Sequence, residues 1–196
     1  STWMCVVHGM QGSNERMIRL VNDLLAANRI ESGSLKLKEE PVSFAEAVHT
    51  VMADLEPLAR ASKIELVLEM PGTLPPVRGD KDRITVVVQN LVENAIKYTK
   101  AGSVRVSVQP NDAAVRFSVA DTGVGIPERE QKQVFQKFFR STSATKIRSV
   151  GTGLGLFIAR AIVEGMGGTI GFSSREGEGS TFWFTLPRAS VPATIS

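Results

Sequence analysis

One stretch of the sequence places two asparagines and a lysine where they could act together. Asn90, Asn94 and Lys97 are four and then three residues apart, so they share one face of the helix predicted here. Asparagine is a weak helix former, and two on one face indicate a polar task. An amide oxygen can ligate Mg²⁺, and a lysine can balance phosphate charge. The alternative is a solvated helix face, which for Lys97 alone is the better explanation.

A second candidate is the loop DTGVGIP, which follows an apolar strand at residues 121–127. The Asp121 carboxylate can accept a hydrogen bond from an amino group, and adenine offers one. Gly123 and Gly125 allow the backbone to approach a flat ring closely. A turn that closes a strand is the alternative. An aspartic protease would need a second such acid in a large β-rich fold, and the sequence has neither.

The third candidate is the segment GTGLGLFIARAIV, in which a glycine-rich loop opens into a helix at residues 151–163. The N-terminus of a helix can bind phosphate. Three familiar nucleotide motifs are excluded, because Leu156 takes the sixth position of the dinucleotide fingerprint and neither the P-loop nor the eukaryotic kinase signatures occur. A turn that only ends a lid explains this segment equally well when it is taken alone.

Together these elements resemble the catalytic domain of sensor histidine kinases. QNLVENAIKYT is similar to the N box, DTGVGIP to the G1 box, VFQKFFR to the F box and GTGLGL to the G2 box, in the family's order, within residues 35–187. The amphipathic segment RMIRLVNDLLAANRIESG resembles the second helix of that family's dimerisation domain. Type II topoisomerases, mismatch-repair ATPases and the large heat-shock chaperone share the ATP fold, but neither the F box nor this helix.

The resemblance implies a role for each box residue. Asn94 would hold the Mg²⁺ ion that bridges the phosphates of ATP, and Asp121 would accept from the adenine amino group. Asn90, Lys97 and Arg140 are the expected catalytic residues. Lys146 and Arg148 are weaker candidates in the lid, which Phe135, Phe138 and Phe139 would anchor. The other expected nucleotide-binding residues, besides Lys97 and Phe138, are Tyr98, Gly123, Gly125, Ile126, Gly151, Thr152, Gly153, Leu154 and Gly155.

The sequence departs from the family at the phosphoacceptor, because the H box, typically H-E-[LI]-R-T-P-L, does not occur. His8 has no acid after it and lies too near the following helix, and His49 fits a structural histidine. We therefore expect the γ-phosphoryl group of ATP to pass to a histidine outside this chain, so that this chain does not phosphorylate itself. A cognate response regulator and a homodimeric parent protein are the other expected partners.

Two further functions stay open at this point. One is a degenerate kinase domain that acts as a nucleotide-gated binding module, although the intact Asn94, Asp121 and G2 glycines argue against it. The other is an ATP-driven clamp or chaperone, which would need a middle domain.

Hydrophobic periodicity predicts the elements that position these groups. Helices are expected over residues 14–33, 43–61, 81–99 and 127–139 and after the G2 loop, with Pro57 kinking or breaking the last turn of the second. Strands are expected over residues 35–44, 63–70, 103–110, 113–121, 168–175 and 180–187, with a brief strand in the loop over 71–80 and a polar loop over 140–152. The predicted fold class is α+β: a two-layer α/β sandwich of a mixed, largely antiparallel sheet on about three helices, which the resemblance identifies as the Bergerat fold, preceded by one amphipathic helix.

Four segments follow from these patterns. Residues 1–13 are expected to be a tag or a non-native N-terminus, residues 14–34 part of a dimerisation helix, residues 35–187 the ATP-binding domain and residues 188–196 a loose tail. The first helix has an apolar face that nothing before it can cover, so we expect another chain or a segment outside this sequence to pack there. That face carries Met17, Leu20, Val21, Leu24 and Leu25.

Composition limits the class of protein. The chain has 196 residues, of which 42% are hydrophobic and 22% charged, as in globular proteins. The net charge of +3 is scattered, which does not indicate nucleic-acid binding. No apolar run reaches the roughly 18 residues needed to span a membrane. Cys5 is the only cysteine, which fits a cytoplasmic setting.

Overall fold

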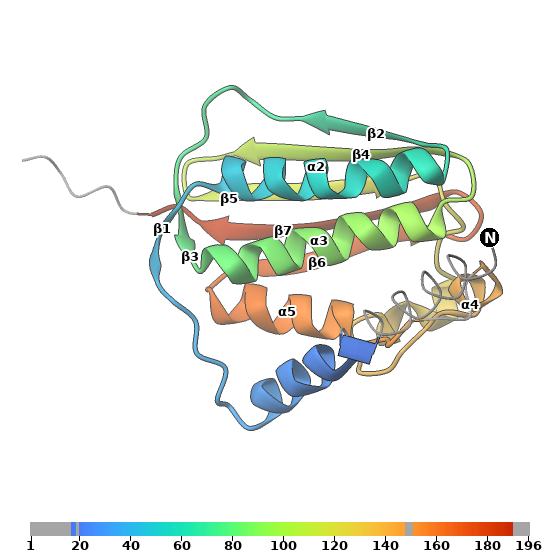
Figure 1. Cartoon of the computed structure of the whole chain (residues 1–196), viewed down its shortest axis with the longest axis horizontal. Coiled ribbons are helices and arrows are strands. Elements are labelled where there is room, and N and C mark those ends of the chain that lie inside the picture. The colour runs from blue at the N-terminus through green and yellow to red at the C-terminus, as the bar shows by residue number, and fades with distance from the viewer. Residues whose placement is uncertain (1–16, 19, 148–150, 190–196) are drawn as a thin grey trace, which may run out of the picture.

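A five-stranded sheet carries the fold in this computed structural model, which describes residues 17–18, 20–147 and 151–189. β2 pairs with β4 in parallel, and the other three neighbouring pairs are antiparallel (Figure 1). The predicted mixed, largely antiparallel sheet is therefore confirmed. Its strands in spatial order are β2 (Ile64–Glu69), β4 (Gly102–Pro110), β5 (Ala114–Asp121), β7 (Gly179–Pro187) and β6 (Thr169–Arg175).

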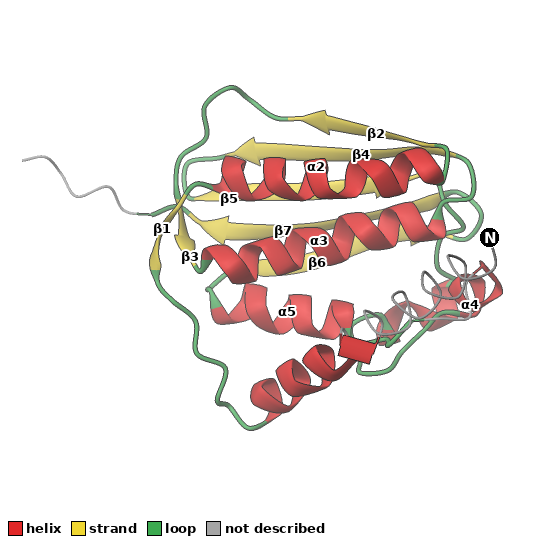
Figure 2. Ribbon diagram, in the orientation of Figure 1, coloured by secondary structure: helices red, strands yellow, loops and turns green. Residues whose placement is uncertain are grey.

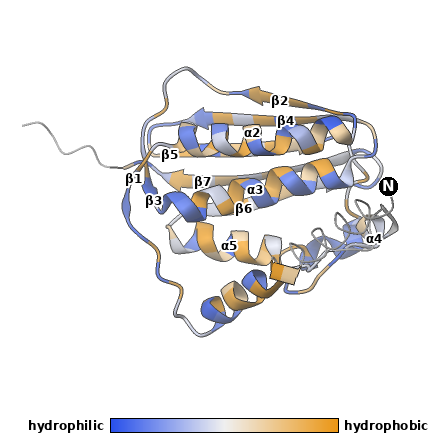
Figure 3. Cartoon of the chain, viewed as in Figure 1, coloured by the Kyte–Doolittle hydropathy of each residue, from blue (hydrophilic) through white to orange (hydrophobic). Residues whose placement is uncertain are grey.

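Three helices cover one face of this sheet, as Figure 2 shows. They are α2 (Phe44–Ala61), α3 (Lys81–Tyr98) and α5 (Gly155–Gly165). The rings of Phe117 and Phe184 stack on the covered face with centroids 5.1 Å apart, and Phe44 of α2 meets both edge-on. Apolar and polar residues alternate along α2 and α3 (Figure 3), so each helix buries one side against the sheet. This is the predicted two-layer α/β sandwich.

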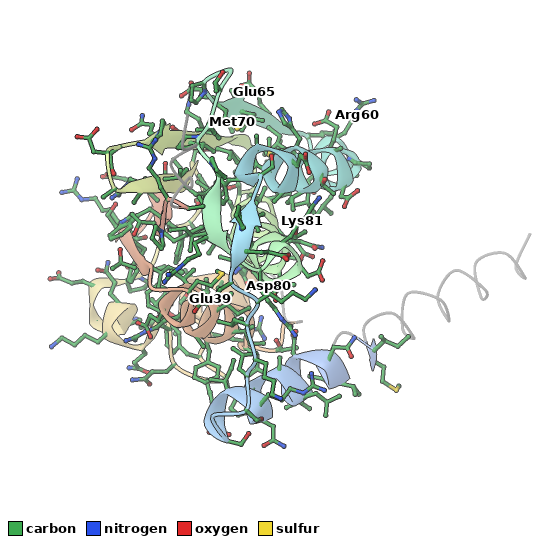
Figure 4. The ribbon with its side chains drawn as sticks, turned by 90° about the vertical axis from the view of Figure 1, so that its left-hand side faces the viewer. Glu39, Arg60, Glu65, Met70, Asp80 and Lys81 are labelled. Carbon is green, nitrogen blue, oxygen red and sulfur yellow. The ribbon has the colours of Figure 1, made fainter. Side chains whose placement is uncertain are left out.

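Capping side chains begin the helices where the sequence predicts. Ser43 caps α2, and Asp80 Oδ1 accepts the backbone N–H groups of Asp82 at 3.1 Å and Arg83 at 3.2 Å to begin α3. Asp80 Oδ2 also accepts from the backbone N–H of Lys38 at 3.2 Å. Figure 4 shows this end of the molecule, with Asp80 and Lys81 where α3 begins. Asp80 therefore fixes both the start of the helix and the path of the chain that leads into the domain.

A small second sheet differs from the expectation for residues 35–44. Only β1 (Glu40–Val42) is a strand there, and it pairs antiparallel with β3 (Val77–Gly79). Because β3 offers just three residues for pairing, the alternating residues before β1 stay irregular. The brief strand predicted in the loop over 71–80 is confirmed as β3.

Helix extents differ from the prediction at three places. α2 continues past Pro57 to its last residue, because Leu55 and Ala59 on either side of the proline are buried in the core. The helix predicted over 127–139 is a 3₁₀ helix, η1 (Glu128–Gln133), followed by turns. The loop predicted over 140–152 contains α4 (Thr142–Ile147).

A long-range cap and a local cap together begin the unexpected α4. The buried Glu130 carboxylate of η1 accepts from the backbone N–H of Thr142 at 2.9 Å and from its hydroxyl at 2.7 Å. Burial raises the pKa of Glu130, but these hydrogen bonds together with the charge of Arg129 outweigh it and hold that pKa below its usual value. Ser141 also caps α4 locally, because its hydroxyl accepts the backbone N–H of Ala144 at 3.1 Å. Only the contribution of Glu130, twelve residues away, has no local signal in the sequence.

The N-terminal helix comprises residues 17–18 and 20–31 of the described chain. Gly33, the predicted stop, lies two residues past the last helical residue with φ +65°. There the Gly33 N–H reaches Ile30 O at 3.1 Å and the Ser34 N–H reaches Arg29 O at 2.9 Å. Ala27 is buried against the domain. The predicted apolar face stays largely exposed: Met17, Leu20, Val21, Leu24 and Leu25 are 41–64% exposed, although Met17 and Leu20 also border the cavity described below.

Candidate functional site

A cavity of about 1050 Å³ lies between α3, the loop after β5 and the loop before α5. Three regions that are far apart in the sequence meet there, at residues 90–98, at residues 121–126, and at residues 139–144 together with 151–156. The residues singled out from the sequence that line it are Asn90, Asn94, Lys97, Tyr98, Asp121, Gly125, Ile126, Arg140, Gly151, Thr152, Gly153 and Gly155.

Asp121 forms one end of the cavity at the last residue of β5. Its Oδ1 accepts the backbone N–H of Gly123 at 2.8 Å and that of Ser180 at 3.3 Å. Burial raises the pKa of the Asp121 carboxyl from 3.8 to about 6, and the two hydrogen bonds offset part of that rise. Within the described residues both bonds use the same oxygen, so the second oxygen can accept from a ligand.

Glycine is required where the loop after Asp121 packs on neighbouring backbone. Gly125 has φ +62°, and a Cβ there would overlap the carbonyl oxygen of Arg175. A Cβ at Gly123 would overlap the carbonyl oxygen of Tyr98 at the end of α3. The carboxylate is therefore held by a loop with no room for a side chain at these positions.

The polar face of α3 forms the middle of the cavity. Asn90 lies against the start of α5, where a Cβ at Gly155 would be 3.0 Å from Asn90 Oδ1. Lys97 Nζ lies 2.6 Å from Oε1 of Glu93, one turn earlier on the same helix. Asn94 completes this face between them.

The far end of the cavity is made by the loop that leads into α5. A Cβ at Gly151 would lie 3.6 Å from Nε of Arg140, so the guanidinium lies along this loop. Gly153 has φ +67° and packs on the backbone of Phe138. The Thr152 hydroxyl accepts from the backbone N–H of Leu154 at 3.2 Å and donates to Asp23 Oδ2 of the N-terminal helix at 3.1 Å.

Three residues expected to bind nucleotide do not line the cavity. The Phe138 side chain is 62% exposed, and its backbone has φ +60°. Gly153 packs on the backbone of Phe138 and not on its ring. Leu154 is fully buried where α5 begins. Gly123 donates its backbone N–H to the Asp121 carboxylate. Gly123 and Phe138 therefore contact lining residues, Asp121 and Gly153, without lining the cavity themselves.

The remaining candidates divide into those that the structure places and those outside the described residues. Phe139 lines the cavity, and Phe135 packs edge-on against Phe172 at 5.8 Å. His49 is exposed on α2 and is not a lining residue. His8, Arg148 and the Lys146 side chain lie outside the described part.

Several lining residues were not expected from the sequence. Glu93 precedes Asn94, and its spacing of four from Lys97 could have indicated an ion pair. Ser180 and Phe182 come from β7, and only the β5–β7 register, which places Ser180 opposite Asp121, reveals them. Asp23 reaches the cavity from the N-terminal helix, for which no local pattern gives a signal.

Comparison with known proteins decides the family. The family described as histidine kinase-, DNA gyrase B-, and HSP90-like ATPase matches residues 79–190. The solved catalytic domain of the histidine kinase ThkA is 31% identical, with a TM-score of 0.66, over 80% of this chain and 100% of that one. This chain belongs to that family, as the catalytic ATP-binding domain of a sensor histidine kinase.

Longer kinases contain a region similar to this catalytic domain. The sensory/regulatory protein RpfC of Xanthomonas campestris pv. campestris is 36% identical over 92% of this chain, and the sensor histidine kinase WalK of Bacillus subtilis is 35% identical over 90%. Full-length ShkA, solved in complex with AMPPNP, is 30% identical with a TM-score of 0.81, over 98% of this chain and 40% of that one. The chain spans 26% of RpfC and 29% of WalK, about a quarter of the curated relatives it matches.

One further solved structure shows ThkA in complex with the response regulator protein TrrA. It is 28% identical to this kinase domain, with a TM-score of 0.71, over 91% of this chain and 49% of that one.

The donor groups of this catalytic domain suit a cation that arrives with its own ligands. The described residues hold no cluster of three or more His, Cys, Asp or Glu that could bind a metal ion alone. Asn94 lines the cavity and its side chain carries an amide oxygen, and Mg²⁺ commonly takes few protein ligands together with phosphates and water. Mg²⁺ bound to a nucleotide therefore fits the site. Among the described helices, none is both long and apolar enough to cross a membrane.

Proposed function

We propose that this domain binds Mg²⁺–ATP with adenine at Asp121 and the phosphates between α3 and the start of α5. One cavity that joins a buried carboxylate to a polar helix face and a helix N-terminus carries the proposal. Small-molecule pockets are typically about 300–1,000 Å³, so this cavity has room for a nucleotide with its metal. The second oxygen of Asp121 would accept from the adenine amino group.

The residues around the phosphates would position and neutralise them. Asn94 would hold Mg²⁺ with Asn90 beside it, Lys97 and Arg140 would contact phosphate oxygens, and the loop before α5 would present backbone N–H groups. Phosphoryl transfer depends on positioning and charge stabilisation more than on covalent chemistry by the protein. Mg²⁺, when bound, would supply the largest part of that positive charge.

The acceptor in this proposal is a histidine outside this chain, on the dimerisation domain of a kinase protomer. Among the described residues, the one histidine, His49, lies away from the cavity. The exposed apolar face of the N-terminal helix supports a dimeric parent protein, in which this helix would be part of the dimerisation domain. A response regulator would then take the phosphoryl group, as the complex of the similar kinase ThkA suggests, and we expect this relay in the cytoplasm.

Titration calorimetry of the 196-residue chain with Mg²⁺–AMPPNP tests the binding step. We expect saturable binding that is weakened about 30- to 100-fold in Asp121→Asn, while Glu164→Gln, on the exposed face of α5, binds like the wild type. No binding at millimolar nucleotide would contradict the proposal and favour a degenerate module.

Labelled ATP tests the location of the acceptor. The chain alone is expected to retain no phosphoryl label, and the dimerisation domain of its parent protein, added separately, is expected to become labelled. Stable label on His8 would contradict an acceptor outside this chain.

A further inference from the structure

A carboxylate occupies the part of the cavity where the proposed phosphates would lie. Glu93 lines the cavity, and its side chain is only 14% exposed. It lies 2.6 Å from Nζ of Lys97, whose side chain is 28% exposed. An acid beside a triphosphate is unfavourable, so its presence here calls for a physical reason.

The charges of the described lining residues sharpen this point. Asp23, Glu93 and Asp121 are acidic, whereas Lys97 and Arg140 are basic, so the wall carries more negative than positive groups. Such a wall does not compensate the charge of a metal-free triphosphate. It matches a nucleotide better when a divalent cation accompanies the phosphates.

Glu93 directly neutralises one of the proposed phosphate-binding groups, Lys97. Both members of the pair are on α3, one turn apart, and the helix fixes their spacing. Because they are largely shielded from water, their attraction is stronger than that of an exposed pair. A metal-free nucleotide must therefore compete with the Glu93 carboxylate for Lys97.

We propose that Glu93 makes this cavity select metal-bound ATP over metal-free ATP. This inference rests on the proposed function. Without a metal, Glu93 neutralises the charge of Lys97, so Lys97 attracts the phosphates of ATP less. With a metal, a cation bound beside Asn94, the next residue along α3, offsets the charge of Glu93. Lys97 is then available to the phosphates. Glu93 is thus a specificity-determining residue that acts through Lys97.

Glu93→Gln tests this role because it keeps the size of the side chain and an oxygen acceptor but removes the charge. Titration calorimetry would measure ATP affinity in excess EDTA and in excess Mg²⁺. We expect affinity for metal-free ATP to rise about tenfold and affinity for Mg²⁺–ATP to change less than about threefold. An unchanged ratio of the two affinities would overturn the inference.

The double variant Glu93→Gln with Lys97→Met separates selection through Lys97 from general repulsion. It removes a neutral pair, so metal-free ATP should bind within about threefold of the wild type while Mg²⁺–ATP binds more weakly. If the gain for metal-free ATP persists without Lys97, the carboxylate acts directly on phosphates and the proposed mechanism is wrong.

Glu164→Gln is the matched control. Glu164 pairs with Arg160 four residues earlier at 2.8 Å on α5, with both side chains half exposed, and neither lines the cavity. Neither affinity should change in this variant. A wild-type chain that binds neither form of ATP would overturn the proposed function together with this inference. A wild type that binds Mg²⁺–ATP, with an unchanged ratio in Glu93→Gln, would overturn this inference alone.

Discussion

The two ends of the cavity are held by different kinds of interaction. Around Asp121, backbone groups dominate: two N–H groups fix its carboxylate, and its loop packs on neighbouring main chain. At the other end Gly153 also packs on backbone, but side chains join the loop before α5 to the N-terminal helix through Thr152 with Asp23, and Lys137 forms an ion pair with Glu31 of the same helix. The Asp121 end is therefore rigid and intolerant of added atoms, whereas the side-chain contacts of the other end can be retuned by changing charge. Substitutions at the two ends should have different effects.

Gly125→Ala should have the largest effect, because it adds a methyl group at the rigid end. We expect it to lower the free energy of unfolding by about 3 kcal/mol or more, since left-handed strain adds to a clash with Arg175 backbone. Gly177→Ala is the control, because Gly177 has φ +82° but open space around it, and it should cost only about 1–2 kcal/mol. Urea unfolding measures both, and equal losses would show that the loop adjusts.

Asp121→Asn should separate binding from folding at the same end. The asparagine oxygen can keep the hydrogen bonds from Gly123 and Ser180, but an NH₂ group then faces the adenine amino group. We expect about a 30- to 100-fold loss of Mg²⁺–ATP affinity in calorimetry. Stability at pH 7 should not fall, because burial of the ionised carboxylate opposes folding. If Asp121→Asn binds Mg²⁺–ATP as tightly as the wild type, Asp121 does not contact adenine.

The pH dependence of binding should follow the raised pKa of Asp121. With a pKa of about 6, most of the carboxylate is ionised at pH 7 and about one-tenth at pH 5, so affinity should fall about tenfold between these values. The free energy of unfolding should change with pH in the opposite direction to the affinity. The pKa of Asp121 is higher in the folded chain than its unfolded value of 3.8, so the stability that protonation provides is complete below pH 3.8 and is lost as pH rises through 6.

Asp121→Asn also serves as the reference for the pH titration, because ATP itself titrates. The wild type should lose more affinity towards low pH than this variant does. Parallel pH profiles of the two proteins would show that Asp121 does not control the effect.

Sequence patterns predicted the elements whose signals are local. Ser43 and Asp80 placed the starts of α2 and α3, and helical spacing placed Asn90, Asn94 and Lys97 on one face. The glycines after Asp121 predicted a close approach of the backbone in this loop. They did not predict which segments of the chain would pack against it.

The features that sequence could not reveal depend on residues far apart in the chain. Glu130 caps α4 from twelve residues away, and Ser180 meets Asp121 through the register of β5 and β7. The contact of Asp23 with Thr152 joins residues 129 positions apart. Glu93 is different, because its ion pair with Lys97 is local, but whether that pair faces water or a cavity is decided by α5 and its preceding loop.

Asp23→Asn should have the smallest effect and tests the side-chain end. An asparagine oxygen can still accept from the Thr152 hydroxyl, so the contact stays while one negative charge leaves the cavity wall. We expect Mg²⁺–ATP affinity to rise about two- to threefold, with less gain at high salt because the interaction is electrostatic. Glu31→Gln is the control, since Glu31 pairs with Lys137 and does not line the cavity, and it should leave affinity unchanged. If Asp23→Asn instead weakens binding, the charge of Asp23 is needed to hold the loop before α5 in place. Nucleotide binding would then depend on a fixed arrangement of groups at this end of the cavity as much as at the Asp121 end.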